Sequence, residues 1–433
     1  MIGLYIITFL TIISLISVVL FKPEVKLFKL KLETFWLVTS LGMCFLVIFR
    51  YISPFEIYQG LTKETSINPI NILILFLSMT ILSIILDELG FFSQLAALAL
   101  NKAGGKQIKL FLYLYGIVSL LTIFTSNDII ILTFTPFICY FTKYAKINPI
   151  PYLMAEFVGA NTWSMILIIG NPTNIYLASS YQIGFMSYFT TMALPSIASA
   201  LLALGLLLLI FKKSLTKDTI SYEKLSIKLK HKRIVIIALI HLSLCTILLS
   251  ISSYLNWSMW LIALFFCSFM CLILLIFDLI TYKKPYVILK TLKRAPWSLA
   301  PFILSMFIFV LTLSKFGVTY KIYELLSIGP NIWTYGLTSF LTSNIINNIP
   351  MTVLYSDIIS HISINQIPAI YASIIGSNIG AYLTPLGALA GIMWMRILKK
   401  EKILFSFKDF IKYGILISIP TIVVALLSLN LII

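Results

Sequence analysis

Long apolar segments, each about 20 residues in length, follow one another along almost the whole chain. An α-helix of roughly this length matches a hydrocarbon layer roughly 30 Å thick, so such segments are candidate membrane spans. We expect ten crossings, at residues 2–21, 32–50, 70–88, 152–178, 190–211, 234–253, 259–281, 297–315, 366–395 and 410–431. The pattern predicts an all-α polytopic membrane protein that has no separate soluble domain.

Two further apolar segments do not fit single crossings. Residues 110–142 are flanked by positive charge at both ends, with Lys109 before them and Lys143 after them, whereas residues 331–356 have none at either end. A segment whose two ends carry the same charge signal should enter and leave the membrane on one side. We therefore predict a re-entrant hairpin in each segment.

The positive charges indicate the orientation of the chain. Of the 32 Lys and Arg residues, 28 fall in six loops, at 22–31, 102–109, 143–146, 212–233, 283–294 and 396–412. Lys and Arg accumulate in cytoplasmic loops, so these six loops are predicted inside and both termini outside. The net charge of +17 is then a topology signal and not a sign of nucleic-acid binding. The predicted location is the inner membrane of a bacterial cell.

Composition supports the same class of protein. Apolar residues make up 60% of the chain and charged residues 11%, and soluble domains have about 25% charged residues. The five cysteines lie scattered in apolar segments, and the sequence has no His-Glu zinc motif, no nucleophile elbow and no phosphate-binding loop. We expect no catalytic residues, no metal site, no cofactor and no enzymatic activity.

An internal repeat recurs at an offset of 217 residues. The tripeptide Thr-Ser-Asn at 125–127 returns at 342–344, and INPIPYLMAEFVGAN (147–161) returns as INQIPAIYASIIGSN (364–378). The shared Asn, Pro and Gly residues are uncommon in so apolar a chain. Weak internal symmetry of this kind is typical of transporters built from inverted repeats.

The charge map gives the two copies opposite directions in the membrane, so the repeat is predicted to be inverted. The predicted organisation is a first repeat at 1–211 with a hairpin at 110–142 and an interrupted helix at 152–178, a basic cytoplasmic linker at 212–233, and a second repeat at 234–433 with a hairpin at 331–356 and an interrupted helix at 366–395.

Polar residues gather in the middle of each hairpin and each interrupted helix, as TSND (125–128), TSNIINNIP (342–350), GNPTN (170–174) and LTPLG (383–387). Non-helical backbone at membrane depth persists only against protein, water or a ligand, and free helix N-termini favour an anion or the negative end of a neutral oxyacid. The candidate substrate- or ion-binding residues are Ser126, Asn127, Asp128, Asn161, Gly170, Asn171, Pro172, Thr173, Asn174, Ser343, Asn344, Asn347, Asn348, Asn378, Thr384, Pro385 and Gly387. The alternative is that these residues only pack or kink the helices.

Acidic residues inside membrane segments should be paired or functional. Asp128 lies in the first hairpin turn and its repeat counterpart is Ile345, so the repeat does not require it. We expect it to couple transport to a proton or cation, the alternative being a carboxylate that caps backbone N–H groups. Glu156 is expected to be solvated, and Asp87 and Glu88 to anchor or gate the protein.

Seven segments carry a resemblance to a known family: LDELGFF (86–92), SNDIIILTFTP (126–136), NPTNI (171–175), RAPW (294–297), INNIP (346–350), LTPLGALAGIMW (383–394) and SFKDFIKYGILISIP (406–420). In order and spacing they resemble the arsenite/antimonite efflux permeases, a family of the ion-transporter superfamily that is related to the sodium-coupled dicarboxylate symporters. The resemblance implies an elevator-type carrier. Where the family's pattern usually carries aspartate, this chain has Asn161 and Asn378, and its GNPTN is more like other anion-transporting branches.

The sequence leaves several functions open. The first is a secondary carrier for small oxyanions or metalloids, with arsenite or antimonite efflux as the leading candidate. The alternatives are a sodium- or proton-coupled permease for carboxylates or other anions, and an ion channel. The expected partners are a small anionic or neutral oxyacid substrate, a coupling proton or sodium ion and the lipid bilayer, and a homodimer and a separate ATPase subunit stay open.

Overall fold

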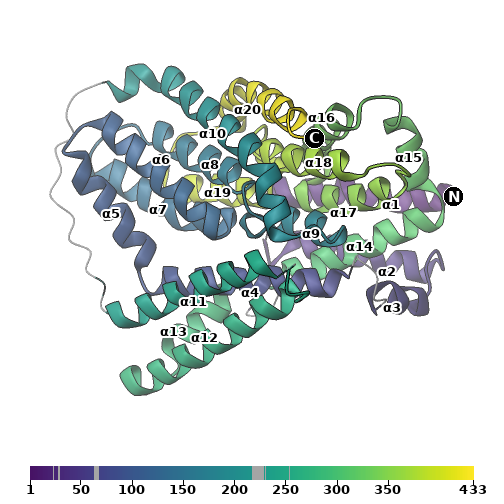
Figure 1. The fold of residues 1–433 in the computed structure, drawn as a ribbon, viewed down its shortest axis with the longest axis horizontal. Helices are drawn as coiled ribbons and strands as arrows, with labels where there is room; N and C mark the ends of the chain where they lie inside the picture. Colours follow the sequence, from purple (N-terminus) through teal and green to yellow (C-terminus); the bar gives the residue numbers. More distant parts are fainter. Residues whose placement is uncertain (23, 28–29, 63–67, 217–228, 230, 253) are drawn as a thin grey trace.

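The computed structural model describes residues 1–22, 24–27, 30–62, 68–216, 229, 231–252 and 254–433 (Figure 1). The described chain is nearly all helical, which confirms the predicted all-α polytopic class. Within the predicted basic linker at 212–233, residues 217–228 and 230 lie outside the described part. One short antiparallel pair, β1 (Glu24–Leu27) and β2 (Leu30–Glu33), lies in a loop for which no strand was expected.

The helices form two groups by their packing. The peripheral group comprises α1 (Ile2–Phe21), α2 (Thr34–Ile48), α3 (Pro54–Thr62), α4 (Pro69–Glu88), α11 (Lys232–Ile251), α12 (Met259–Tyr282), α13 (Tyr286–Arg294), α14 (Leu299–Lys315) and α15 (Val318–Leu326). The central group comprises α5 (Phe91–Ala103), α6 (Gln107–Phe124), α7 (Asn127–Tyr144), α8 (Ile150–Trp163), α9 (Pro172–Ser180), α10 (Phe185–Leu215), α16 (Asn331–Ile346), α17 (Asn348–Ser360), α18 (Ile367–Gly380), α19 (Leu389–Lys400) and α20 (Phe407–Asn430). In the peripheral group α4 packs against α11, α12 and α13, and α14 packs against α2.

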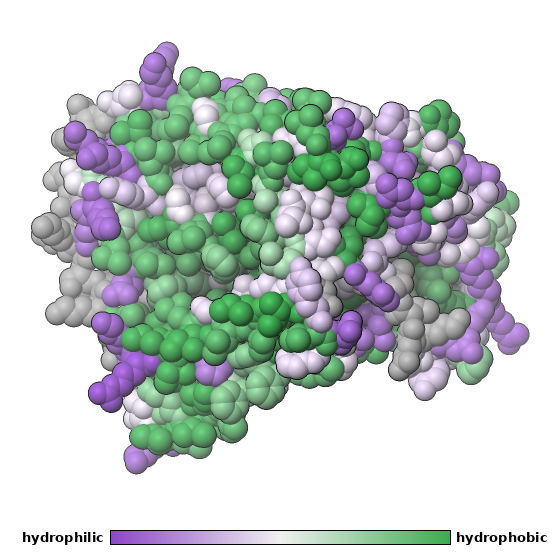
Figure 2. Space-filling view, viewed as in Figure 1, coloured by the Kyte–Doolittle hydropathy of each residue, from purple (hydrophilic) through white to green (hydrophobic). Residues whose placement is uncertain are grey.

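The surface matches a protein that is embedded in lipid. Figure 2 shows apolar side chains over the middle of the molecule and hydrophilic ones gathered toward the two ends of its long axis. Phe265 and Ile280 on α12 are 63% and 71% exposed, which is costly in water and favourable in hydrocarbon. Eight helical segments of the described residues are long and apolar enough to cross a membrane. The expected number of ten crossings stays a prediction, because two of the expected spans are interrupted and α2 is short.

Each predicted hairpin is a pair of helices joined by a very short turn. Helices α6 and α7 meet at Thr125 and Ser126, which are both extended, and α16 and α17 meet at Asn347. The backbone of Asn347 has φ 75° and ψ 154°, a region that is largely reserved for glycine and costs roughly 1–3 kcal/mol in other residues. The surrounding structure must hold this turn in place.

The two interrupted helices break in the same way. Helix α8 is followed by a 3-10 turn, η1 (Ile168–Gly170), and then by α9; helix α18 is followed by η2 (Pro385–Gly387) and then by α19. Both breaks depend on a glycine. A Cβ on Gly170 would lie 2.3 Å from the carbonyl O of Ser164, and one on Gly387 would lie 2.4 Å from that of Gly380. Only glycine lets the backbone cross itself so closely.

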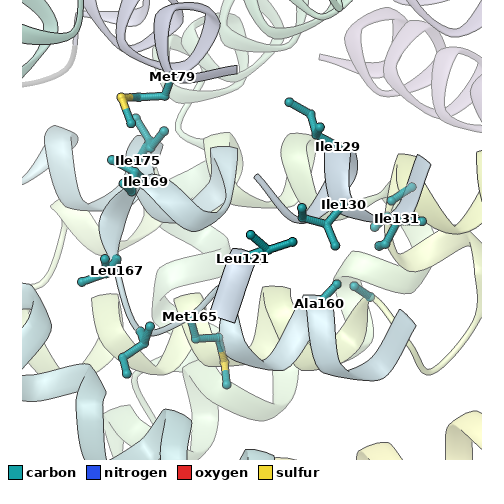
Figure 3. Close-up of a cluster of buried hydrophobic side chains, with 14 of the residues drawn as sticks. Met79, Leu121, Ile129, Ile130, Ile131, Ala160, Met165, Leu167, Ile169 and Ile175 are labelled. Carbon is teal, nitrogen blue, oxygen red and sulfur yellow. The ribbon is translucent and has the colours of Figure 1, made fainter. Parts of the chain in front are cut away.

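Apolar packing holds the polar breaks in position. Leu121 of α6, Ile130 of α7 and Ala160 of α8 belong to one continuous buried cluster, and Figure 3 shows them beside the turn of the first hairpin. Interiors packed to this density leave side chains little freedom to move. The hairpin turns and helix breaks are therefore fixed parts of the central group.

Candidate substrate-binding site

Asn378 on α18 joins the two interrupted helices. Its Oδ1 accepts hydrogen bonds from Asn171 Nδ2 at 2.8 Å and from Ser164 Oγ at 3.0 Å, and its Nδ2 donates to Asn174 Oδ1 at 2.7 Å. All of these side chains are buried. A buried network in which every amide is satisfied fixes one arrangement of its members. The two halves of the repeat are thus locked together at their helix breaks.

Neighbouring residues extend this junction. Ser377 Oγ donates to Thr173 Oγ1 at 2.8 Å, and Asn174 Nδ2 donates to the carbonyl O of Ser164 at 2.8 Å. Pro172 begins α9 and Pro385 begins η2, where their missing N–H groups cost nothing. The structure therefore brings the polar residues of the first helix break together with Asn378 of the second.

The first hairpin turn presents polar atoms that have no partner. Asn127 Nδ2 donates to Asn161 Oδ1 at 3.0 Å, and Asn161 Nδ2 donates to the carbonyl O of Phe157 at 2.8 Å. Asn127 Oδ1 and Ser126 Oγ are buried and have no hydrogen-bond partner among the described residues. Leaving such groups unpaired costs roughly 1–3 kcal/mol each, so they point to a ligand or water at this turn.

At the second hairpin turn, Asn344 and Asn347 form hydrogen bonds with residues of the same repeat. Asn344 Oδ1 accepts from Thr384 N at 3.0 Å and from Thr384 Oγ1 at 2.7 Å, while Asn344 Nδ2 donates to the carbonyl O of Gly380 at 3.0 Å. Asn347 Nδ2 donates to the carbonyl O of Leu386 at 3.1 Å. The side chains of Asn344 and Asn347 therefore tie the hairpin to the second helix break.

Ser343 and Asn348 are the other two predicted residues at this turn. Ser343 Oγ donates to the carbonyl O of Phe340 at 2.9 Å and is fully buried. Asn348 Oδ1 is buried without a partner among the described residues. The role of every one of these residues in binding stays a prediction.

A cavity of about 580 Å³ reaches the first hairpin turn from one side of the molecule. Ser126 and Asp128 line its inner part, and Phe76 of α4, Leu299 of α14 and Leu389 of α19 line its walls. Within the described chain, the Asp128 carboxylate forms no hydrogen bond or ion pair. The cavity lies between the peripheral group and the central group, so it borders only the first of the two turns.

Charged residues cluster around the same cavity. Arg294 Nη2 lies 2.7 Å from Asp87 Oδ2, Arg294 Nη1 lies 2.6 Å from Glu88 Oε1, and Thr133 Oγ1 of α7 donates to Asp87 Oδ2 at 3.0 Å. Asp87 therefore joins the peripheral α4 to helix α7 of the first hairpin, and its role as an anchor or gate stays a prediction. Sequence analysis identified RAPW as a motif but assigned no role to Arg294, which pairs with Glu88 across 206 residues of chain.

The structure contradicts the expectation for Glu156. We expected this side chain to be solvated near the start of an interrupted helix, but Glu156 is 1% exposed. Thr135 Oγ1 lies 2.9 and 3.1 Å from its two carboxyl oxygens. The expectation was wrong because α6, α7 and α10 pack against α8, which sequence position alone does not reveal.

Comparison with known proteins gives consistent results. The citrate transporter family, CitMHS, matches residues 34–376. The "Arsenical pump membrane protein" of Escherichia coli is 27% identical over 370 residues, covering 82% of this chain and 85% of that protein. The "Putative arsenical pump membrane protein" of Bacillus subtilis is 29% identical over 390 residues, covering 82% and 85%.

The fold also has a counterpart among solved structures. The structure is similar to that of the Alcanivorax borkumensis YdaH transporter, with a TM-score of 0.56 and 12% sequence identity. The match covers 99% of this chain and 97% of that chain. At that identity the likeness shows the fold alone. The resemblance that the motifs indicated is confirmed by the relatives named arsenical pumps, and the family match spans most of the chain. This multi-pass membrane protein belongs to the CitMHS family of transporters.

Proposed function

We propose that this protein is a secondary transporter that exports arsenite or antimonite as the uncharged oxyacid. The observation that carries the proposal is the pair of unpartnered buried atoms, Ser126 Oγ and Asn127 Oδ1, at a turn that borders the cavity. A trihydroxy acid of arsenic or antimony offers hydroxyl groups that both donate and accept. An amide oxygen and a serine hydroxyl are matched to such a ligand.

The charges around the cavity favour a neutral substrate over citrate. The charged lining residues are Glu24, Glu33, Asp128, Lys293, Arg294 and Arg396. Three are acidic and three basic, and both arginines are already paired, Arg294 as described and Arg396 Nη1 with Glu24 Oε1 at 3.3 Å. A citrate trianion in a partly dry site would need cations that are free to bind it. An uncharged oxyacid needs none.

The runner-up is a carboxylate permease. It is supported by the description of the family as citrate transporters. In this alternative, Lys293 and the arginines at the cavity would exchange their present partners for substrate carboxylates. The relatives that share about 28% identity with this chain are named arsenical pumps, which supports the first candidate.

We propose that transport follows an elevator-type alternating-access mechanism. The junction at Asn378 makes the two interrupted helices one unit, which could move against the peripheral helices without breaking its own hydrogen bonds. The cavity lies at the end of the molecule where Lys293, Arg294 and Arg396 gather, so under the positive-inside rule it faces the cytoplasm. We propose a bacterial inner-membrane location with both termini outside, which the distribution of Lys and Arg supports.

Purified protein in liposomes tests the proposal. Arsenite and antimonite should enter proteoliposomes with saturable kinetics and show counterflow against trapped substrate, and citrate and other dicarboxylates should not compete. Asn127→Ala provides the control for the site. Citrate transport without metalloid transport would establish the permease alternative, and flux that neither saturates nor shows counterflow would identify a channel.

A further inference from the structure

Glu156 is a second carboxyl group inside the central group, distinct from Asp128 and from the cavity. It lies on α8, is 1% exposed, and forms no ion pair with any described residue. An ionised carboxylate in such a place is costly unless cations or several hydrogen bonds compensate it. The hydrogen bonds around Glu156 indicate how this cost is avoided.

The hydrogen bonds of the Thr135 hydroxyl group indicate the protonation state of Glu156. Thr135 Oγ1 lies 2.5 Å from the carbonyl O of Ile131 and 2.9 and 3.1 Å from the two oxygens of Glu156. A hydroxyl group has one proton to donate. With that proton on Ile131 O, which is the shortest of the three contacts, the hydroxyl can only accept from Glu156. The carboxyl group must then carry the proton itself.

A second donor lies beside the same carboxyl group. The indole Nε1 of Trp394 on α19 adjoins Glu156 but makes no hydrogen bond of normal geometry with a described residue. The rings of Phe157, Phe405 and Phe410 hold the indole, with centroids 5.3, 5.4 and 5.6 Å from it. If Glu156 loses its proton, Trp394 can donate to it and the Thr135 hydroxyl can rotate toward it. The surroundings of Glu156 therefore offer hydrogen-bond partners to both of its protonation states.

Other titratable groups do not neutralise Glu156. From the described elements packed on α8, the Cys139 thiol of α7 faces it, and the charge of Glu401 acts on that same thiol. Among the described residues, no lysine, arginine or histidine lies within ion-pair distance of the Glu156 carboxyl group. Release of the proton therefore leaves a net negative charge in the central group, which is the change that a coupling site requires.

The position of Glu156 relates it to Asp128. Thr135 follows Asp128 by seven residues, on the same face of α7 and about 10 Å further along the helix. At the offset of the repeat, the counterparts of Asp128 and Glu156 are Ile345 and Ser373. Asp128 and Glu156 thus both belong to the first repeat, and neither is required by the symmetric architecture.

We infer that Glu156 is a proton-carrying residue of the transport cycle, which takes up a proton and later releases it to water as the central group changes its exposure. The inference rests on the proposed function, because it gives that transporter a second group to couple export to a proton gradient. Thr135 is a positioning residue for both forms of Glu156, and Trp394 is a positioning residue for the ionised form. Asp128 remains the group at the turn itself.

Infrared spectroscopy tests the protonation without any substrate. The wild-type protein in lipid should show a carbonyl-stretch band of a buried protonated carboxyl group that disappears as the pH is raised, remains in Asp128→Asn and is absent in Glu156→Gln. Trp394→Phe keeps the ring packing and should shift the disappearance of the band to higher pH. A spectrum in which Glu156→Gln removes no band, or removes one that never titrates, overturns the inference while leaving the proposed function intact.

Proton counting in proteoliposomes tests the coupling. Glu156→Gln should reduce the number of protons moved per exported metalloid by about half, if each acid carries one, and should leave substrate counterflow within twofold of wild type. Thr135→Val should weaken the pH dependence of transport, and Thr135→Ser should restore it. An unchanged proton ratio in Glu156→Gln would overturn the inference. Absence of metalloid transport by the wild type would instead overturn the proposed function.

Discussion

The two hairpin turns share a sequence pattern but differ in how their polar atoms are used. At the first turn, Ser126 Oγ and Asn127 Oδ1 are unpaired and Asp128 borders the cavity. At the second turn, Asn344 makes hydrogen bonds to Thr384 and Gly380. The comparison teaches that equivalent residues of a repeat can be used differently: in the described chain Asn127 keeps an unpaired amide oxygen at the first turn, whereas Asn344 ties the second turn to the helix break beside it.

The largest expected effect separates Asn127 from Asn344. Asn344→Ala leaves Thr384 N and the carbonyl O of Gly380 without their partner in a partly buried place, at up to roughly 1–3 kcal/mol each, so we expect less folded protein and a lower melting temperature. Asn127→Ala removes the partner of one buried acceptor, Asn161 Oδ1, so we expect a smaller loss of folded protein but a loss of transport of about tenfold or more, since each 1.4 kcal/mol of lost binding is a factor of ten. Size-exclusion profiles and substrate uptake measure the two effects.

Equal loss of folded protein in both variants would break the comparison, because it would make both asparagines structural. Retained transport in both variants would mean that the two asparagines serve only in helix packing. Each result is distinguishable from loss of expression by quantifying the protein in the membrane.

The second prediction concerns Asp128, the acid that only the first turn has. Asp128→Asn keeps the shape of the side chain but fixes a neutral state, so gradient-driven accumulation should be lost while exchange at equal concentrations persists. Asp128→Ala should lose both activities. Accumulation by Asp128→Asn that matches wild type would assign coupling to another group, such as Glu156 or sodium held by carbonyls of the turn.

The third prediction concerns the link between α4 and the first hairpin. Arg294→Gln removes two ion pairs from Asp87 and Glu88 and leaves Asp87 bound only by Thr133, so the first hairpin should move more freely. We expect a several-fold change in the transport rate with substrate affinity changed less than twofold. Thr133→Val is the matched change on the first hairpin, because it removes the hydrogen bond to Asp87. A change in substrate affinity larger than the change in transport rate would contradict a gating role.

The smallest effect should lie outside both hairpins, at Glu56 on α3. Lys315 Nζ at 2.7 Å from Glu56 Oε1, followed by hydrogen bonds from Ser53, lowers the pKa of the Glu56 carboxyl to about 2. Because the folded pKa lies below the ordinary value of 4.5, the stabilisation is complete above about pH 4.5 and is lost as the pH falls toward 2. The group is exposed, so screening keeps the effect small.

Thermal unfolding of Glu56→Gln should differ from wild type by no more than a degree or two at pH 7, and the difference should vanish near pH 2. Transport should be unchanged. A loss of transport in this variant would mean that the loop beside α3 acts on the hairpins, and the comparison would then have to include it.

Most of the fold follows from the sequence. Apolar length predicted the helices, the lysine distribution predicted which segments were hairpins, and the offset of 217 residues placed Asn127 and Asn344 at equivalent turns. These features are local or periodic, so they can be read without knowledge of contacts. The inverted direction of the repeat and the binding role of the candidate residues stay predictions.

The tertiary structure decided how the same residue types are used. Asn161 and Asn378 are equivalent in sequence, but Asn161 binds the first hairpin and Asn378 joins the opposite helix break. Glu156 is buried beside Thr135 for a similar reason. The role of a side chain on a helix face depends on the helices that pack against it, because pairing and desolvation arise from groups that are 21 to 207 residues apart in these examples. Sequence periodicity sets which atoms are available, and packing determines which of them remain free to bind.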